Sequence, residues 1–167
     1  ALGTMERQLT YMVRLVDDLL DLSRVASGKL ELRKQRVELR TAIENAVEIS
    51  APLIAQRQHA LILDLPDEPM WLDADITRLS QVIANVLGNA AKYTPNHGTI
   101  SVRARRDGAF AELRVTDTGL GIPQEQLAQV FEMFAQVRGQ DERSQGGMGI
   151  GLALARRLLS LHGGTIH

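Results

Sequence analysis

The chain has 167 residues, of which 44% are hydrophobic and 23% charged, and its formal net charge is -1. This composition indicates a folded globular chain of one or two compact units and excludes a disordered one. The near-neutral charge gives no electrostatic reason to expect a nucleic-acid partner, and the lack of cysteine excludes disulfides, thiol catalysis and cysteine-based zinc sites.

The histidine spacing, the apolar runs and the chain ends indicate which metal sites and membrane segments to expect. None of the four histidines forms a metal-ligand spacing such as HExxH, so no zinc site is expected. No apolar run approaches the roughly 18 residues that a membrane-spanning helix needs, and we expect no signal peptide among these residues. Because the chain opens without Met and closes on HGGTIH, we expect a fragment of a larger protein, with any membrane segment outside it.

Residues 1 to about 27 are predicted to form one long helix. Its apolar residues repeat at spacings of three and four, as in a heptad seam: Leu2, Met5, Leu9, Met12, Val16 and Leu19. Val13, Leu15, Leu20 and Leu22 widen this stripe, which suits a helix in a bundle. We expect a second chain or a missing helix to cover it; packing on its own domain is the alternative. Ser27-Gly28 ends the helix.

The remaining pattern predicts an α+β sandwich, with helices segregated on an antiparallel or mixed sheet. A helix over 40–56 is expected to point Ile43, Ala46, Val47 and Ile49 inward. The sequence Asp107-Gly108 predicts the tight turn of a β-hairpin made by residues 98–106 and 109–117. The other expected elements are an extended piece at 30–32, strands at 60–66 and 70–75, and helices at 75–92, 123–133 and 150–162.

The predicted helix over 75–92 has two distinct faces. At 100° per residue, Arg78, Gln81, Asn89 and Lys92 all fall within about 40° of Asn85. The opposite side is apolar and should pack on the sheet, with Ile76, Leu79, Ile83, Val86, Leu87 and Ala90. Amides can serve as neutral oxygen ligands and Lys92 as a phosphate-seeking charge, although polar residues face solvent on many such helices.

Two glycine-containing motifs follow. DTGLG, residues 117–121, comes directly after a strand, and its two glycines would bring backbone close to a ligand. Asp117 could accept a hydrogen bond from an exocyclic amine, or it could cap a helix in an ordinary surface turn. GGMGIGL, residues 146–152, precedes a helix and is either an anion cradle of backbone N–H groups or a flexible hinge.

Between these motifs lies the polar segment 137–145, whose composition suits a mobile lid. Arg138 and Arg143 could reach a phosphate from it. Of the two aromatic residues that precede the segment, Phe131 is expected in the core and Phe134 at the hinge of the lid.

Taken in order, these motifs resemble the histidine kinases of two-component signalling. NVLGNAAKYTP resembles the N box of that family, DTGLG its G1 box, FEMF its F box and GGMGIGLAL its G2 box. The first helix resembles the second helix of the dimerisation and phosphotransfer domain. The resemblance divides the chain into that helix at 1–29 and a catalytic ATP-binding domain at 30–167, which would lack its last strand.

The resemblance implies the Bergerat ATP-binding sandwich and a site for Mg²⁺ and ATP. Asn89 would hold Mg²⁺, Asn85 and Lys92 would contact phosphate, and Asp117 would read the adenine amine. Tyr93 would pack near the adenine or ribose. The other residues implied at the nucleotide are Gly119, Gly121, Ile122, Arg143, Gly147, Met148, Gly149, Ile150, Gly151 and Leu152.

The relatives of this fold that hydrolyse ATP carry a Glu as general base where this chain has Asn85. The amide cannot take a proton, which favours phosphoryl transfer to a protein residue over hydrolysis. The alternative is a Bergerat-fold ATPase, or a nucleotide-binding interaction module, without histidine kinase activity. Titration with nucleotide tests the kinase interpretation, which requires that Mg²⁺-ATP binds.

The acceptor histidine of the family is not expected within this chain. His59, His97, His162 and His167 all lack the acceptor's sequence context, and His162 is interpreted as structural. The chain should therefore bind ATP without phosphorylating itself. The resemblance also implies a homodimer through the first helix, a response regulator as partner, and a cytoplasmic location.

Overall fold

The computed structural model describes residues 2–135 and 149–167, with nine helices and strands in those two ranges and a 3-10 turn at Gln124–Gln126. In chain order they are α1 (Leu2–Ala26), β1 (Gln35–Glu38), α2 (Leu39–Gln56), β2 (Ala60–Asp64), β3 (Trp71–Ala74), α3 (Ile76–Tyr93), β4 (Thr99–Asp107), β5 (Phe110–Asp117) and α4 (Gly151–Leu161).

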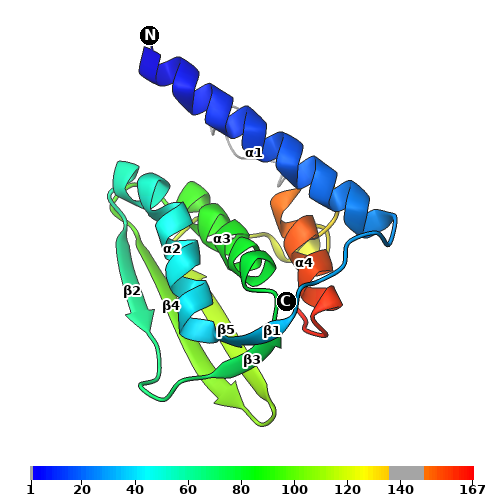
Figure 1. The fold of residues 1–167 in the computed structure, drawn as a ribbon. Coiled ribbons are helices and arrows are strands. Elements are labelled where there is room, and N and C mark those ends of the chain that lie inside the picture. Colours follow the sequence, from blue (N-terminus) through cyan, green and yellow to red (C-terminus); the bar gives the residue numbers. More distant parts are fainter. Residues whose placement is uncertain (1, 136–148) are drawn as a thin grey trace.

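The strands form two sheets, and the helices gather on one side of the larger sheet. β2 pairs parallel with β4, β4 pairs antiparallel with β5, and β1 and β3 form a separate antiparallel pair. In Figure 1, α2 and α3 lie in front of the strands, α4 lies beside α3, and α1 runs across the end of this layer. The predicted α+β sandwich preceded by a long helix is therefore confirmed.

The main core fills the space between the sheet and the helices α2 and α3. Ile43 of α2, Leu87 of α3, and Ile100 and Val102 of β4 have almost no exposed surface. A second, smaller cluster joins Leu22 of α1 to Val82 of α3 and to four residues at the start of α4 and within it. Among the described residues, these four are Ile150, Leu154, Ala155 and Leu158. The two clusters contact α3 through different residues, which fixes the helix that carries the candidate site.

Most predicted elements are confirmed within one or two residues. The hairpin turn consists of Gly108 and Ala109, and Gly108 has a φ of +58°, which glycine adopts without strain. The inner face predicted for the helix over 75–92 is also confirmed, because Leu79, Ile83 and Leu87 are buried.

Two predictions about local structure are wrong, and one strand was not predicted. The unpredicted strand is β1: residues 30–32 form neither helix nor strand, and β1 begins at Gln35 because the partner strand β3 lies opposite residues 35–38. Ile49 is 50% exposed, since the inward stripe of α2 continues through Ser50. Residues 123–133 form no α-helix beyond the 3-10 turn, because most of their apolar side chains, such as Leu127, find no core to pack against.

Asp75 fixes the start of α3 and joins it to two other segments. Its Oδ1 accepts hydrogen bonds from the N–H groups of Thr77 and Arg78, and its Oδ2 accepts one from the N–H of Arg33. The N–H of Asp75 donates to Nε2 of His162, whose Nδ1 donates to a carbonyl of α4. His162 is therefore a structural residue, as predicted.

Replacing Asp75 should cost stability in a pH-dependent way. Burial alone would raise the pKa of Asp75, but the three backbone N–H donors and Arg78 hold it below the usual value of 3.8. The charged carboxylate therefore stabilises the fold above that pH, and its contribution is lost as the pH falls through the lowered pKa. We expect Asp75→Ala to lower the free energy of unfolding by about 2–4 kcal/mol at pH 7, from a lost cap and an unsatisfied N–H.

Denaturant unfolding from pH 7 to pH 2 checks this expectation. The stability difference between the original chain and Asp75→Asn, which cannot titrate, should shrink as the pH falls below 3.8. Asp73→Asn, an exposed neighbour on β3, serves as the control and should show no such trend. A constant difference across this range would contradict the assigned role.

Candidate functional site

The polar stripe of α3 faces three different neighbours along its length. At its start, Arg78 and Gln81 contact aspartates of α1. In its middle, Nδ2 of the buried Asn85 donates a hydrogen bond of 3.1 Å to the carbonyl of Gly151, in the first turn of α4. Among the described residues, this leaves the last third of the stripe, with Asn89 and Lys92, for a ligand. The sequence had placed all five residues on one face without distinguishing these surroundings.

The end of α3 carries three candidate residues. Asn89 is half-buried, and its side-chain amide makes no hydrogen bond within residues 2–135 and 149–167. Nζ of Lys92 donates to the hydroxyl of Tyr93 at 3.1 Å and lies 4.7 Å from the centre of its ring. The lysine charge is thereby held beside the aromatic ring, so the two side chains that the sequence predicted near phosphate and base are neighbours.

The DTGLG turn lies against the end of α3. The N–H of Gly119 donates to Oδ1 of Asp117 at 2.7 Å, and the N–H of Leu120 donates to the carbonyl of Tyr93 at 3.4 Å. Thr118 holds the turn from the other side, since its Oγ1 accepts from the N–H of Thr99 and its own N–H donates to the Thr99 carbonyl. The role of Thr118 was missed, although its place inside the motif could have suggested it.

Gly119 and Gly121 are needed in this turn for different reasons. A Cβ on Gly119 would lie 2.8 Å from the carbonyl oxygen of Tyr93 and 2.5 Å from Oδ1 of Asp117. Gly121 has free space around it but a φ of +71°, so its backbone conformation is the one that glycine favours. Ile122, which follows, is exposed and could contact a ligand.

The residues that precede α4 reach the same region from the other side. Gly149 has a φ of +67°, and its carbonyl accepts a hydrogen bond from the N–H of Phe134 at 3.0 Å. The side chain of Ile150 is buried in the second cluster, which leaves only its backbone for a ligand, and Leu152 is half-buried. The candidates Arg143, Gly147 and Met148, together with Arg138, lie outside the described residues.

The two aromatic residues of FEMF differ in their surroundings. Phe131 is half-buried, and the guanidinium of Arg156 lies 5.8 Å from the centre of its ring. Phe134 is 62% exposed and has a φ of +64°, a left-handed conformation that is costly for a residue with a side chain. The strained backbone at Phe134 and the glycine at 149 thus meet through one hydrogen bond.

The residues fit a magnesium ion that arrives together with a nucleotide. No three His, Cys, Asp or Glu side chains of the described ranges come together as a complete metal site. Mg²⁺ usually keeps several waters and takes one or two protein oxygens in addition to substrate phosphates. The side-chain amide of Asn89 can supply one such oxygen, so phosphate and water oxygens would have to complete the coordination of Mg²⁺.

We expect Gly119→Ala to weaken nucleotide binding by about tenfold, because overpacking against backbone costs about 1–3 kcal/mol. The new methyl group would push the turn away from the Tyr93 carbonyl and disturb Asp117. Isothermal titration with ATP measures the change. Gly88→Ala in α3 is the matched control, since a Cβ at this helical position would meet no atom of the described residues within 4 Å. Equal losses in both variants would show that close packing at Gly119 is not the cause.

Comparisons with known proteins agree with this geometry. Residues 74–167, more than half of the chain, match the family of histidine kinase-, DNA gyrase B-, and HSP90-like ATPases. The chain is 38% identical over 159 residues to the circadian input-output histidine kinase CikA of Synechococcus elongatus, which covers 93% of this chain and 21% of that protein.

Two solved structures share the fold. The mycobacterial sensor histidine kinase MprB has a TM-score of 0.67 and 31% identity, over 77% of this chain and 82% of that one. Full-length ShkA, in complex with AMPPNP, has a TM-score of 0.75 and 28% identity, over 90% of this chain and 31% of that one.

The chain therefore belongs to the histidine kinase-, DNA gyrase B- and HSP90-like ATPase family. Its relatives place it in the sensor histidine kinase branch, where it corresponds to the ATP-binding catalytic domain, and the predicted Bergerat-type fold is confirmed. The chain spans roughly a fifth of the length of the curated relatives it matches. Within the residues that the structure describes, no helix combines the length and the apolar character needed to cross a membrane.

Proposed function

We propose that this chain binds Mg²⁺-ATP at the end of α3 and presents the γ-phosphoryl group for transfer to a histidine of a dimerisation helix. The observation that supports this most is the meeting of three motifs around α3. Asn85 holds the start of α4, and the Tyr93 carbonyl holds the DTGLG turn. The described part of the G2 box thus contacts α3 at Asn85 and the G1 box contacts it at Tyr93, the two positions that flank Asn89 and Lys92 in the N box.

At the base-binding end, Asp117 is proposed to recognise the adenine amine. Because the N–H of Gly119 already donates to Oδ1 of Asp117, Oδ2 of the carboxylate is left to accept a hydrogen bond from the ligand. The lack of a side chain at Gly119 and Gly121 would let the base approach the backbone closely. Tyr93, the last residue of α3, whose carbonyl accepts a hydrogen bond from the same turn, would contact the adenine or ribose.

At the phosphate end, charge and backbone N–H groups are proposed to bind together. Lys92 would move from Tyr93 to a phosphate oxygen, and Asn89 would hold Mg²⁺, which neutralises charge on the phosphates when bound. The start of α4 would add N–H groups and its positive dipole end, with Gly149 and Gly151 allowing close approach. Gly147, Met148 and Arg143 are proposed to complete this cradle.

Transfer to another protein residue is favoured over hydrolysis by the surroundings of Asn85. Its Nδ2 is engaged by Gly151, and an amide has no basic site for the proton of an attacking water. In the proposed reaction a histidine nitrogen attacks the γ-phosphorus, the bond to the β,γ-bridging oxygen breaks, and ADP leaves. The chain's part is to position and orient the nucleotide.

The domain organisation, the partners and the location are proposed from the similarity to sensor histidine kinases. Residues 1–29 would be the second dimerisation helix, pairing in a homodimer, and residues 30–167 the catalytic domain. The exposed apolar face of α1 is consistent with such pairing. Relay to an aspartate of a response regulator, and a position on the cytoplasmic side, complete the proposal.

Two measurements test this function. At 100 times its Kd, Mg²⁺-ATP should raise the free energy of unfolding by about 2.7 kcal/mol; an unchanged Tm would contradict nucleotide binding. With γ-labelled ATP, the chain alone should stay unlabelled, whereas a separate dimerisation domain that carries the acceptor histidine should become labelled. Label on His59, His97 or His162 instead would contradict the assignment.

A further inference from the structure

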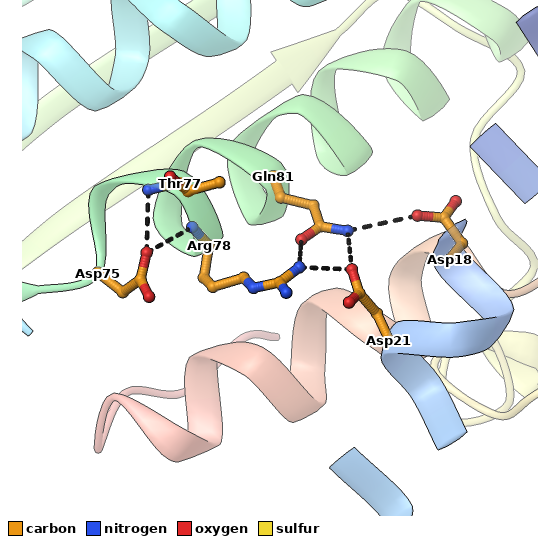
Figure 2. Close-up of polar contacts among 6 residues, drawn as sticks. All are labelled: Asp18, Asp21, Asp75, Thr77, Arg78 and Gln81. Atoms are coloured by element: carbon orange, nitrogen blue, oxygen red, sulfur yellow. Dashed lines mark hydrogen bonds and ion pairs between the residues drawn. The ribbon is translucent and has the colours of Figure 1, made fainter. Parts of the chain in front are cut away.

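The two ends of α3 are held in different ways. Figure 2 shows the first turn, where the carboxylate of Asp75 caps the helix and the side chains of Arg78 and Gln81 contact α1. At the other end, the last four carbonyl groups of a helix lack a donor within it, and in α3 they belong to residues 90–93. Because Pro95 follows and has no N–H, donors must come from other segments.

The carbonyl of Ala91 takes its hydrogen bond from a histidine. Nε2 of His59, which lies between α2 and β2, donates to this oxygen at 2.9 Å. In a longer helix the donor would be the N–H of residue 95, which is a proline. Both Ala91 and His59 are buried. Without the imidazole, the Ala91 carbonyl would therefore be left buried and unpaired, which is costly.

This contact also selects the tautomer of His59. A carbonyl oxygen can only accept a hydrogen bond, so Nε2 must carry the hydrogen. Nδ1 is buried and has no hydrogen-bond partner among the described residues. The opposite neutral tautomer would place an unpaired N–H at Nδ1 and turn a lone pair of Nε2 towards the carbonyl. The Nε2–H form is therefore the one that fits this site.

The backbone on both sides of His59 is fixed by hydrogen bonds. Its own N–H donates to the carbonyl of Ile54, and Gln58 before it has a φ of +56°, so α2 ends in a Schellman motif. After it, the N–H of Ala60 donates to the carbonyl of Gly98 in the loop that follows α3. The imidazole is thus presented by a defined turn that is itself joined to the end of α3.

The helical turn that His59 contacts carries candidate residues of the nucleotide site. Lys92 and Tyr93 directly follow Ala91, and the Tyr93 carbonyl accepts the N–H of Leu120 from the DTGLG turn. The last turn of α3 is therefore bound by His59 at one carbonyl and by the DTGLG turn at another. A shift of Ala91 would move Lys92 and the DTGLG turn together.

We propose that His59 is a positioning residue for the nucleotide site: its Nε2–H holds the Ala91 carbonyl and so sets where Lys92 and the DTGLG turn lie. This role rests on the proposed kinase function, because the ligand concerned is the nucleotide assigned there. His59 acts through Ala91 and touches no ligand itself. Its contact with α3 can be measured without nucleotide.

Three substitutions of His59 test this role by titration with Mg²⁺-ATP. His59→Gln places an amide N–H near the position of Nε2 and should keep the Kd within about twofold of the parent value. His59→Asn carries the same amide on a shorter side chain, at the level of Nδ1, and His59→Leu has no donor. Both should raise the Kd by about tenfold, because they leave the Ala91 carbonyl unpaired.

Val37→Ala separates positioning from a general loss of stability. Val37 is buried in β1, in the separate two-stranded sheet, so its truncation weakens the core without touching the last turn of α3. The Tm should fall at least as far as in His59→Leu, while the Kd, measured well below the Tm, stays at the parent value. Equal losses of affinity in these two variants, or no advantage of His59→Gln over His59→Asn, would overturn the positioning role.

Measurements without nucleotide give an independent test. The N–H groups of Thr94 and Leu120, which donate to carbonyls of the last turn, should exchange with solvent about tenfold faster in His59→Leu and at the parent rate in His59→Gln. Unchanged rates in His59→Leu, or nitrogen NMR shifts that place the ring hydrogen on Nδ1, would overturn the contact. If the parent chain bound no ATP, the proposed function would fail, and the exchange rates would still decide what His59 holds.

Discussion

Asn89→Ala should weaken Mg²⁺-ATP binding by about 100-fold, the largest loss expected from truncating any single side chain of α3. Asn89 is half-buried beside Lys92, and its amide is not engaged within the described part of the chain. Removing it therefore costs the fold little, but it removes the one protein oxygen proposed for the metal. Binding of ATP without Mg²⁺ should change much less.

Titrations with and without Mg²⁺ measure both effects, and Tm without nucleotide shows whether the fold is intact. Asn96→Ala, an exposed asparagine in the loop after α3, is the control and should bind as the parent chain does. If Asn89→Ala lost affinity equally with and without Mg²⁺, Asn89 would be a residue that supports the pocket and not a metal ligand.

The parts of the fold that could be predicted are those whose signal is contained within one element. The periodicity of α3 predicts its buried side, and Asp75 marks its start because a carboxylate there accepts the free N–H groups. β1 was missed because it has only four residues, and its formation depends on pairing with β3, more than thirty residues away. Such pairing leaves little trace in a short sequence window.

The same distinction holds for the candidate site. The motifs predicted which residues would gather, since the type and spacing of Asn89, Lys92 and Asp117 are local properties. They could not predict which neighbours the polar side chains of α3 contact, because Arg78 meets Asp21, a residue 57 positions away in the sequence. A polar residue at helical spacing looks the same whether its neighbour is solvent, a ligand or another helix.

Gly149→Ala should be the most damaging substitution in the loop before α4. A Cβ at this position would lie 2.4 Å from the carbonyl oxygen of Ala135 and 2.8 Å from the carbonyl carbon of Phe134. Both are backbone atoms, so they cannot turn aside as the end of a flexible side chain can. The φ of +67° adds a cost of about 1–2 kcal/mol for any residue with a Cβ.

The clash and the left-handed backbone together should cost about 2–5 kcal/mol. Either the Phe134–Gly149 hydrogen bond breaks, which relieves the clash, or the protein unfolds more easily. We therefore expect a lower Tm and an ATP affinity that falls by about 30-fold or more. Gly151→Ala, two residues on, has ordinary contacts at 3.6 Å from Asn85 and should keep or raise the Tm, because alanine favours a helix. If both variants lost stability equally, helix α4 and not the backbone contact at Gly149 would be the sensitive element.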